Sequence, residues 1–216
     1  MLKLYTYSRS SAAFRVRIAL NLKGLSYQSI PVHLLRGGGE QHSESYAMRN
    51  ASRLLPTLEE GSVSLGQSLA ILEYLEETHP APALLPADAS ARAKVRELAL
   101  SVACDIHPLN NLRVLRYLHA PLQIEEERRN DWARHWISLG FTAIEHTLAR
   151  SGALASGYCF GDAPTLADCC LIPQVFNARR ISLPMDEYPS IQRVHEHCMQ
   201  HEAFIKAAPG AQSDAD

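Results

Sequence analysis

Two adjacent serines, Ser10 and Ser11, stand directly before a run with helical spacing, in which Phe14, Ile18 and Leu22 recur every fourth residue. A serine in this place is a good helix N-cap, and its hydroxyl can also donate a hydrogen bond to an anion beside the positive end of the helix dipole. A thiolate is such an anion: stabilising it by about two pKa units, roughly 2.7 kcal/mol, would leave a thiol of pKa about 8.5 mostly ionised at pH 7. We take Ser10 as the candidate donor to a thiolate and Ser11 as the second candidate, with capping alone as the alternative.

Histidines offer further candidates for ligand binding. His107 and Asn111 are four residues apart, so on a helix they would share one face and could contact one ligand. A lone helical histidine is more often structural or solvated, which is the alternative for His107. Near the C-terminus the sequence also holds a group of potential metal ligands: His195, His197, Cys198 and His201. No His-Glu-x-x-His motif accompanies them, and we predict no metal site.

The composition narrows the class of protein. The chain has 216 residues, of which 46% are hydrophobic and 20% charged, as in an ordinary globular protein. Its 21 basic and 23 acidic residues give a formal charge of -2, without the positive excess that attracts nucleic acid. The N-terminus lacks a signal-peptide pattern and no apolar run approaches about 18 residues, so we expect a cytoplasmic protein with no membrane span. Cysteine spacing predicts reduced thiols, with four in the core: Cys104, Cys159, Cys169 and Cys170.

The first eighty residues alternate between strand and helix patterns. The order strand, helix, strand predicts a parallel pair of strands joined by a crossover helix. A hairpin and a second helix should follow. The expected elements, in chain order, are a strand at 3–7, a helix from Ser10 to a C-cap at Gly24, a strand at 27–34, a hairpin of 54–58 and 63–65, and a helix opened by Gln67 and Ser68.

A stretch rich in proline and alanine at 79–86 interrupts the chain, and no later segment has a clear strand pattern. We therefore predict an α/β domain at 1–80 and an all-helical domain at 87–216, with long amphipathic patterns after the boundary. Thr165 and Asp168 match a capping box that should start a buried helix. The small, polar residues at 209–216 predict a frayed tail.

Several segments share the order and spacing of one enzyme family. The segment from Tyr7 to Leu20 reads YSRSSAAFRVRIAL, which resembles the signature of the zeta class of cytosolic glutathione transferases. This class includes maleylacetoacetate isomerases and bacterial maleylpyruvate isomerases. Segments 67–71, 80–86, 104–111 and 173–180 extend the resemblance over most of the chain. The usual pattern has a cysteine directly after the two serines where this chain has Ala12, which excludes a mechanism that uses the protein's own thiol at this position.

The resemblance implies a thioredoxin-like domain of βαβ-ββα order that binds glutathione, an all-helical domain, a substrate lodged between them, and a homodimer. It also implies a cis peptide bond at Leu55-Pro56, where open backbone groups pair with the tripeptide as an added strand would. Gln67 and Ser68 would bind the γ-glutamyl carboxylate, with local capping as the alternative. Gln41 and His107 match positions that contact glutathione in the family. The further candidate contacts are Ser10, Ser11, Asn111, which shares a face with His107, and Arg113, which lies in the same region.

The same resemblance implies a glutathione-dependent cis-trans isomerase of maleyl keto acids, maleylpyruvate or maleylacetoacetate, in the catabolism of aromatic compounds. The thiolate of glutathione, held by Ser10, would add to the double bond, which then turns as a single bond before elimination. Arg9 and Arg180 would anchor the substrate's carboxylates, with surface ion pairs as the alternative for each. The segment 105–108 and the missing cysteine favour maleylpyruvate.

Two other functions stay open. A general glutathione transferase or dehalogenase, acting on small electrophiles, would use the same thiolate. A non-catalytic glutathione-binding protein would use the two serines only as caps. Loss of Arg180 should separate the first alternative from an isomerase, because a neutral electrophile does not need a guanidinium to hold its carboxylate. Binding to glutathione without turnover of any α,β-unsaturated acid would indicate the second.

Overall fold

The computed structural model describes residues 1–215, except for the side chains of Ala153 and Leu154. The chain forms two compact units: Met1–Leu84 together with Met199–Asp216, and Leu85–Cys198. The break at Leu84 lies in the linker that the sequence predicts. The C-terminal end differs from the expected boundaries, because Met199–Asp216 belongs to the first unit.

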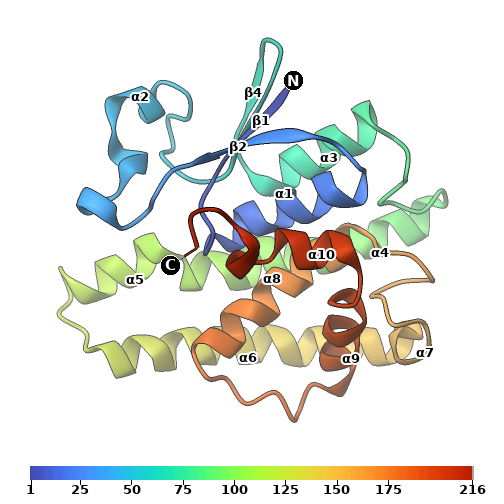
Figure 1. The fold of residues 1–216 in the computed structure, drawn as a ribbon. Helices are drawn as coiled ribbons and strands as arrows, with labels where there is room; N and C mark the ends of the chain where they lie inside the picture. The colour runs from blue at the N-terminus through green and yellow to red at the C-terminus, as the bar shows by residue number, and fades with distance from the viewer. Residues whose placement is uncertain (216) are drawn as a thin grey trace. The chain divides into compact units, whose positions relative to one another are not determined.

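A four-stranded sheet lies at the centre of the first unit (Figure 1). Its order is β2 (Tyr27–Pro31), β1 (Leu2–Thr6), β3 (Thr57–Glu60) and β4 (Val63–Leu65). β1 pairs parallel with β2 and antiparallel with β3, which pairs antiparallel with β4. The predicted crossover unit and hairpin are confirmed. β2 ends before the predicted residue 34 because Thr6, the last residue of β1, pairs with Pro31 and leaves no strand for later residues to join.

Helices complete the first unit. α1 (Ser11–Leu22) joins β1 to β2, and it packs against α3 (Ser68–Thr78) and α10 (Glu202–Ala207). The core between sheet and helices is mostly apolar, although it also buries Arg15 and Arg17 of α1. α1 ends as predicted, with Gly24 in the left-handed region at a φ of 64°. The remaining elements of this unit are η1 (Arg36–Gly38), η2 (Glu40–His42), α2 (Glu44–Ala47) and η5 (Pro209–Ala211).

The second unit contains helices and no strand within its described residues. Its elements are α4 (Ala89–Leu100), the π-helix η3 (Ser101–Ile106), η4 (His107–Asn110), α5 (Leu112–His119), α6 (Glu126–Ser151), α7 (Ala153–Ser156), α8 (Leu166–Arg180) and α9 (Pro189–Cys198). α8 is almost wholly buried and packs against α4 and α9. Thr165 caps α8 with Asp168 in a complete capping box, which confirms that prediction.

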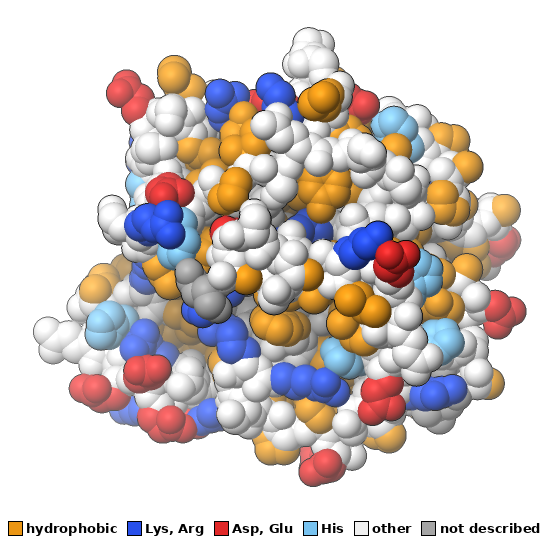
Figure 2. All heavy atoms as spheres, viewed as in Figure 1, with side chains coloured by type: hydrophobic (Ala, Val, Ile, Leu, Met, Phe, Trp, Pro, Cys, Tyr) orange, Lys and Arg blue, Asp and Glu red, His pale blue; other side chains and the backbone are white. Residues whose placement is uncertain are grey.

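The surface agrees with the near-neutral charge. Figure 2 shows Lys and Arg side chains interspersed with Asp and Glu side chains on the face in view, with no large field of one sign. Among residues 1–215, none of the helices has the length and apolar character needed to cross a membrane.

Candidate active site

Ser10 is the N-cap of α1. Its backbone is extended, with φ -74° and ψ 109°, and its Oγ accepts a hydrogen bond of 3.2 Å from the N–H of Ala13. Capping uses a lone pair of the hydroxyl oxygen and leaves the hydroxyl proton to donate elsewhere. Ser11 is the first residue of the helix, and the first turn carries no acidic side chain. The half-buried Ser10 hydroxyl therefore combines a proton donor with the positive end of a helix dipole, which is the arrangement that stabilises an anion.

Gln41 presents a buried amide. The side chain is 5% exposed, its Nε2 lies 3.0 Å from His42 Nε2, and its Oε1 has no hydrogen-bond partner within residues 1–215. A buried carbonyl oxygen without a donor is costly, so an N–H group from a ligand would stabilise it. The close approach of Gly39 permits this placement, because a Cβ there would lie 2.5 Å from the Gln41 amide.

The peptide bond Leu55-Pro56 is cis, as the family resemblance implies. The segment before it is held from both sides: Tyr46 Oη and Asn50 Nδ2 donate to the carbonyl of Leu54, at 2.6 and 3.0 Å. Both side chains also lie 2.9 Å from the hydroxyl of Thr57, just after the proline. The backbone on either side of the bond is therefore fixed without any ligand.

Ser68 begins α3 and is 6% exposed, while Gln67 before it has a φ of 63° and an exposed side chain. Arg15 Nη1, from α1, donates to Ser68 Oγ at 3.1 Å. The serine accepts from a guanidinium, so its own proton can go to an anion at the start of α3. Sequence reasoning missed Arg15, although a charged residue in the middle of the apolar run FRVRIAL was a signal for a buried polar role.

His107 and Asn111 meet, but not on one helix as predicted. His107 lies in η4, whereas Asn111 is the extended N-cap of α5, with φ -69° and ψ 148°. The single helix is wrong because the backbone of Asn111 is extended and its Oδ1 accepts from the N–H of Arg113, so that a new helix begins at Leu112. The Asn111 Nδ2 still lies 3.3 Å from His107 Nε2, and Arg113 is exposed in the first turn of α5.

Arg180, the last residue of α8, belongs to a chain of polar side chains in the second unit. Its Nη2 donates to Asn177 Oδ1 at 2.8 Å, and Asn177 Nδ2 donates to Asn110 Oδ1 at 2.8 Å. Asn110 is buried and donates to the carbonyl of Ile106. These two buried amides, which sequence reasoning did not select, orient an exposed guanidinium and connect the end of α8 to η4.

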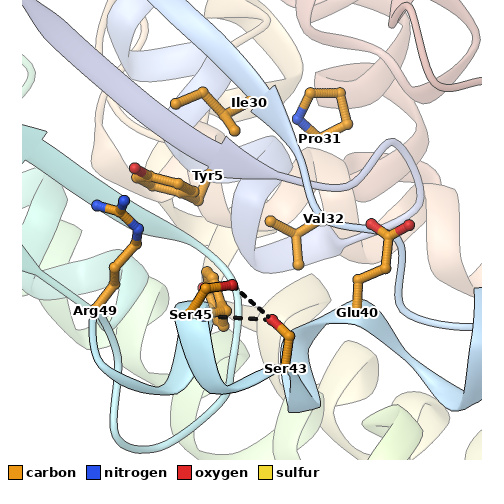
Figure 3. A pocket seen from close by; sticks show the side chains of 9 residues that line it. Tyr5, Ile30, Pro31, Val32, Glu40, Ser43, Ser45 and Arg49 are labelled. Atoms are coloured by element: carbon orange, nitrogen blue, oxygen red, sulfur yellow. Dashed lines mark hydrogen bonds between the residues drawn. The ribbon is translucent and has the colours of Figure 1, made fainter.

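The first unit also has a hollow with a volume of about 200 Å³, whose lining side chains are drawn in Figure 3. Ser43 Oγ lies 3.2 Å from Ser45 Oγ within it, as the dashed line in Figure 3 marks. Arg49 forms an ion pair of 2.7 Å with Glu59 of β3. None of the predicted site residues lines it. The lining residues are Tyr5, Ile30, Pro31, Val32, Glu40, Ser43, Ser45, Tyr46 and Arg49.

His201 and Cys198, two of the potential metal ligands near the C-terminus, take structural places in the fold. Within the described residues, no group of three or more His, Cys, Asp or Glu side chains is placed to hold a metal ion. His201 caps α10, and Cys198 is buried with its Sγ 3.8 Å from Asp168 Oδ1. The prediction that Cys104 is a core thiol is wrong, because the π-helical turn of η3 leaves it exposed. The other three cysteines predicted to lie in the core are buried, as expected: Cys159, Cys169 and Cys170.

Comparison of the sequence and the structure with known proteins identifies the family of this chain. Residues 4–83 match the model of the glutathione S-transferase N-terminal domain, and residues 114–197 match that of the C-terminal domain. A probable maleylacetoacetate isomerase of Vibrio cholerae is 50% identical over 212 residues, which cover 98% of this chain and 97% of the relative. A holo structure of maleyl pyruvate isomerase, a bacterial zeta-class enzyme, matches with a TM-score of 0.95 and 48% identity over 99% of this chain and 100% of the other. The chain belongs to the zeta class of glutathione S-transferases.

A further relative has been solved with glutathione. The maleylacetoacetate isomerase from Anaeromyxobacter dehalogenans, with glutathione bound in its active site, is 44% identical and has a TM-score of 0.88. The match covers 100% of this chain and 98% of that one. The predicted fold class, a βαβ-ββα unit followed by helices, is confirmed as that of a glutathione S-transferase.

Proposed function

We propose that this zeta-class protein is a glutathione-dependent cis-trans isomerase of maleyl keto acids, maleylpyruvate or maleylacetoacetate, in the catabolism of aromatic compounds. The observation that carries the proposal is the Ser10 hydroxyl, which caps α1 and keeps a proton to donate at the helix's positive end. Full-length similarity to isomerases of both substrates supports it.

The residues present fit glutathione. The unpartnered Oε1 of Gln41 can accept from one of its amide groups, and Ser68, with Arg15 behind it, can donate to its γ-glutamyl carboxylate together with Gln67. The backbone of Leu55, next to the cis bond at Pro56, can pair with the peptide-like centre of the ligand. In the second unit we assign His107, Asn111 and Arg113 as further contacts, because the first two already meet at 3.3 Å.

When bound, glutathione supplies a thiolate nucleophile that adds reversibly to a double bond conjugated with a keto group, which allows rotation about the former double bond. The protein's part is to keep that sulfur ionised and to hold the alkene. Ser10 donates a hydrogen bond at the sulfur, with Ser11 as the other candidate donor beside it. Arg9 and Arg180, both exposed guanidinium groups, bind substrate carboxylates and stabilise the negative charge that develops on the keto group.

We also propose that the protein is a homodimer that works in the cytoplasm, where thiols stay reduced. No disulfide joins its five cysteines within the described residues. The homodimer rests on the family resemblance and is checked by size-exclusion chromatography with light scattering, where the mass should be twice that of one chain.

The direct test is an assay of both maleyl acids side by side with a catalytic amount of glutathione. We expect the fumaryl isomer to form from at least one of them while total glutathione stays constant. Consumption of one glutathione for each substrate molecule would contradict the proposal and favour a transferase or dehalogenase. Retention on immobilised glutathione, with no turnover of either acid, would favour a binding protein.

Replacing Arg180 by alanine tests how the substrate is held. We expect kcat/KM for the maleyl acid to fall about 100-fold, because a bidentate bond to a carboxylate is lost, and to fall less than about threefold for a neutral aryl halide. Arg179→Ala is the matched control: it is also exposed at the end of α8 and should leave both substrates nearly unaffected. Equal losses for the two substrates in Arg180→Ala would favour a general transferase.

Replacing Gly39 by alanine tests the role of Gln41. The new Cβ would lie 2.5 Å from the Gln41 amide, so the side chain must move, and we expect glutathione affinity to fall about fivefold, the value of one hydrogen bond. Gly38→Ala is the control, because Gly38 also has a positive φ but has nothing within 4 Å of its added Cβ. Isothermal titration with glutathione should separate the two variants, and equal affinities would contradict the assignment of Gln41.

A further inference from the structure

The C-terminal segment, which we define as residues 199–215, is an ordered part of the first unit. This corrects the prediction of a frayed tail at 209–216. In Figure 1, α10 lies beside α1, and Asn21 Nδ2 from α1 donates to the carbonyl of Ala203 at 3.0 Å. The chain beyond α10 is folded back by Gln212, whose Nε2 donates to the carbonyls of Lys206 and Ala208 at 2.8 and 2.9 Å. These bonds direct the residues after Gln212 toward the start of α1.

Asp214, near the end of this segment, binds the loop of residues 7–10, which ends at Ser10. Its carboxylate Oδ2 accepts from the backbone N–H of Ser8 at 2.9 Å, and its backbone carbonyl accepts from Ser8 Oγ at 3.1 Å. Ser8 is only 2% exposed and lies two residues before Ser10. The loop therefore has both a backbone and a side-chain donor engaged by one residue from the other end of the chain.

Arg17 holds the same loop from the inside. This guanidinium is fully buried, and its Nη1 and Nη2 donate to the carbonyls of Tyr7 and Ser8 at 3.2 and 3.0 Å. Its Nε donates to the carbonyl of Ala207 at 2.9 Å, at the end of α10. Tyr7 in turn accepts from the N–H of Ser10 at 3.0 Å. Arg17 thus joins the C-terminal segment to the loop on which the position of Ser10 depends.

The positive charge of Arg17 also contributes to these contacts. Burial lowers the pKa of Arg17 to about 10, and the charges of Tyr27 and Asp214 oppose that shift. The guanidinium is therefore a cation at neutral pH. A buried cation is costly unless groups around it compensate, and here backbone carbonyls and an acidic side chain do so.

From these contacts we propose that Asp214 and Arg17 are positioning residues for Ser10: the C-terminal segment clamps the loop 7–10, so that the Ser10 hydroxyl stays aimed at the thiolate of glutathione. The inference deepens the proposed function and rests on the role of Ser10 in it. Small displacements of a catalytic group weaken its effect strongly, so a clamp two residues away from Ser10 should influence the bound thiol.

The test measures glutathione itself, with no maleyl acid present. Asp214→Ala removes the acceptor for the Ser8 N–H, and we expect glutathione to bind about fivefold more weakly by isothermal titration. We also expect the pKa of the bound thiol, followed by thiolate absorbance against pH, to rise by about half a unit. Ser213→Ala, at the exposed neighbouring residue, is the matched control and should leave both values unchanged.

Two further variants distinguish the loss of the Asp214 contacts from a general loss of structure. Asp214→Asn keeps an oxygen acceptor in place and should bind glutathione within about twofold of the unmodified chain. A chain that ends at Gln212 loses both contacts of residue 214 and should be at least as impaired as Asp214→Ala, with circular dichroism melting showing that each variant is folded.

Three results would overturn the proposal: unchanged affinity and thiol pKa in Asp214→Ala, an unimpaired chain ending at Gln212, or an Asp214→Asn variant as impaired as Asp214→Ala. Failure of the proposed function is a separate result. The chain could bind glutathione with a lowered thiol pKa and still isomerise neither maleyl acid. That result would contradict the proposed isomerase function but not the positioning role of Asp214 and Arg17.

Discussion

Replacing Ser10 by alanine should lower kcat for the maleyl acid at pH 7 about 25-fold, because the bound thiol loses the hydrogen bond that lowers its pKa by about two units and the ionised fraction falls accordingly. The loss should shrink as the pH rises, since the thiol then ionises without help. Ser10 also caps α1 through its bond with the Ala13 N–H, so the variant should be less stable by about 1 kcal/mol. A pH profile of kcat separates the two effects, because a lost cap alone does not move the pH at which activity appears.

Ser11→Ala is the matched control for this prediction. Ser11 is the neighbouring hydroxyl, lies in the first turn of α1 and is not the N-cap. We expect its replacement to lower kcat by less than about tenfold and to leave the pH profile in place. A larger loss in Ser11→Ala than in Ser10→Ala, together with a shifted profile, would move the thiolate donor from position 10 to position 11.

Replacing Asp168 by alanine should have the largest effect on stability, lowering the free energy of unfolding by about 3 to 5 kcal/mol. The carboxylate is fully buried and accepts from the N–H groups of Cys159 and Thr165, both at 2.8 Å, and from the Thr165 hydroxyl at 2.9 Å. Removing it leaves two backbone donors buried without an acceptor and removes half of the capping box of α8. Burial raises the pKa of Asp168, and the hydrogen bonds from Cys159 and Thr165 oppose that rise.

Denaturant unfolding followed by circular dichroism measures this loss. Asp162→Ala is the control: it is an exposed acid in the loop before α8, and its replacement should change stability by less than about 0.5 kcal/mol. A loss in Asp168→Ala no larger than in the control would mean that the capping box contributes little to the fold.

The elements that the sequence predicted well depend on local patterns. Thr165 and Asp168 form a cap from residues three apart, and Gly24 ends α1 through its own backbone, so both can be inferred from a short window. The cis bond at Leu55 was different, because composition and spacing do not indicate it and only the family resemblance did.

The partners of the buried arginines could not be predicted from the sequence. Arg15 and Arg17 lie on a helix whose neighbours are apolar, and an arginine there usually extends to solvent. Their burial depends on acceptors far away in the chain, such as Ser68 for Arg15 and the carbonyl of Ala207, 190 residues away, for Arg17. The same reason explains why the end of the chain was predicted to be frayed: the partner of Asp214 is Ser8, at the other terminus.

The expected single helix over His107 and Asn111 is interrupted, and the sequence contained a sign of this that the spacing of the two residues does not show. Spacing of four residues suggests a shared helix face, but Asn111 is a good N-cap type, which indicates a new helix beginning after it. The two side chains meet across a bend, at 3.3 Å, so the pairing was correct while the helix was wrong. Arg180 was selected by resemblance, and its orientation depends on Asn177 and Asn110, which only the folded chain brings together.

The central claim is that the sulfur of glutathione, kept ionised by the Ser10 hydroxyl, is the group that attacks the double bond. The most direct measurement is the rate of maleyl acid isomerisation by protein stripped of glutathione, compared with the same protein given glutathione or its S-methyl derivative. We expect activity with glutathione alone and none with the S-methyl form, which has no ionisable thiol. Isomerisation at the full rate by the stripped protein would contradict it.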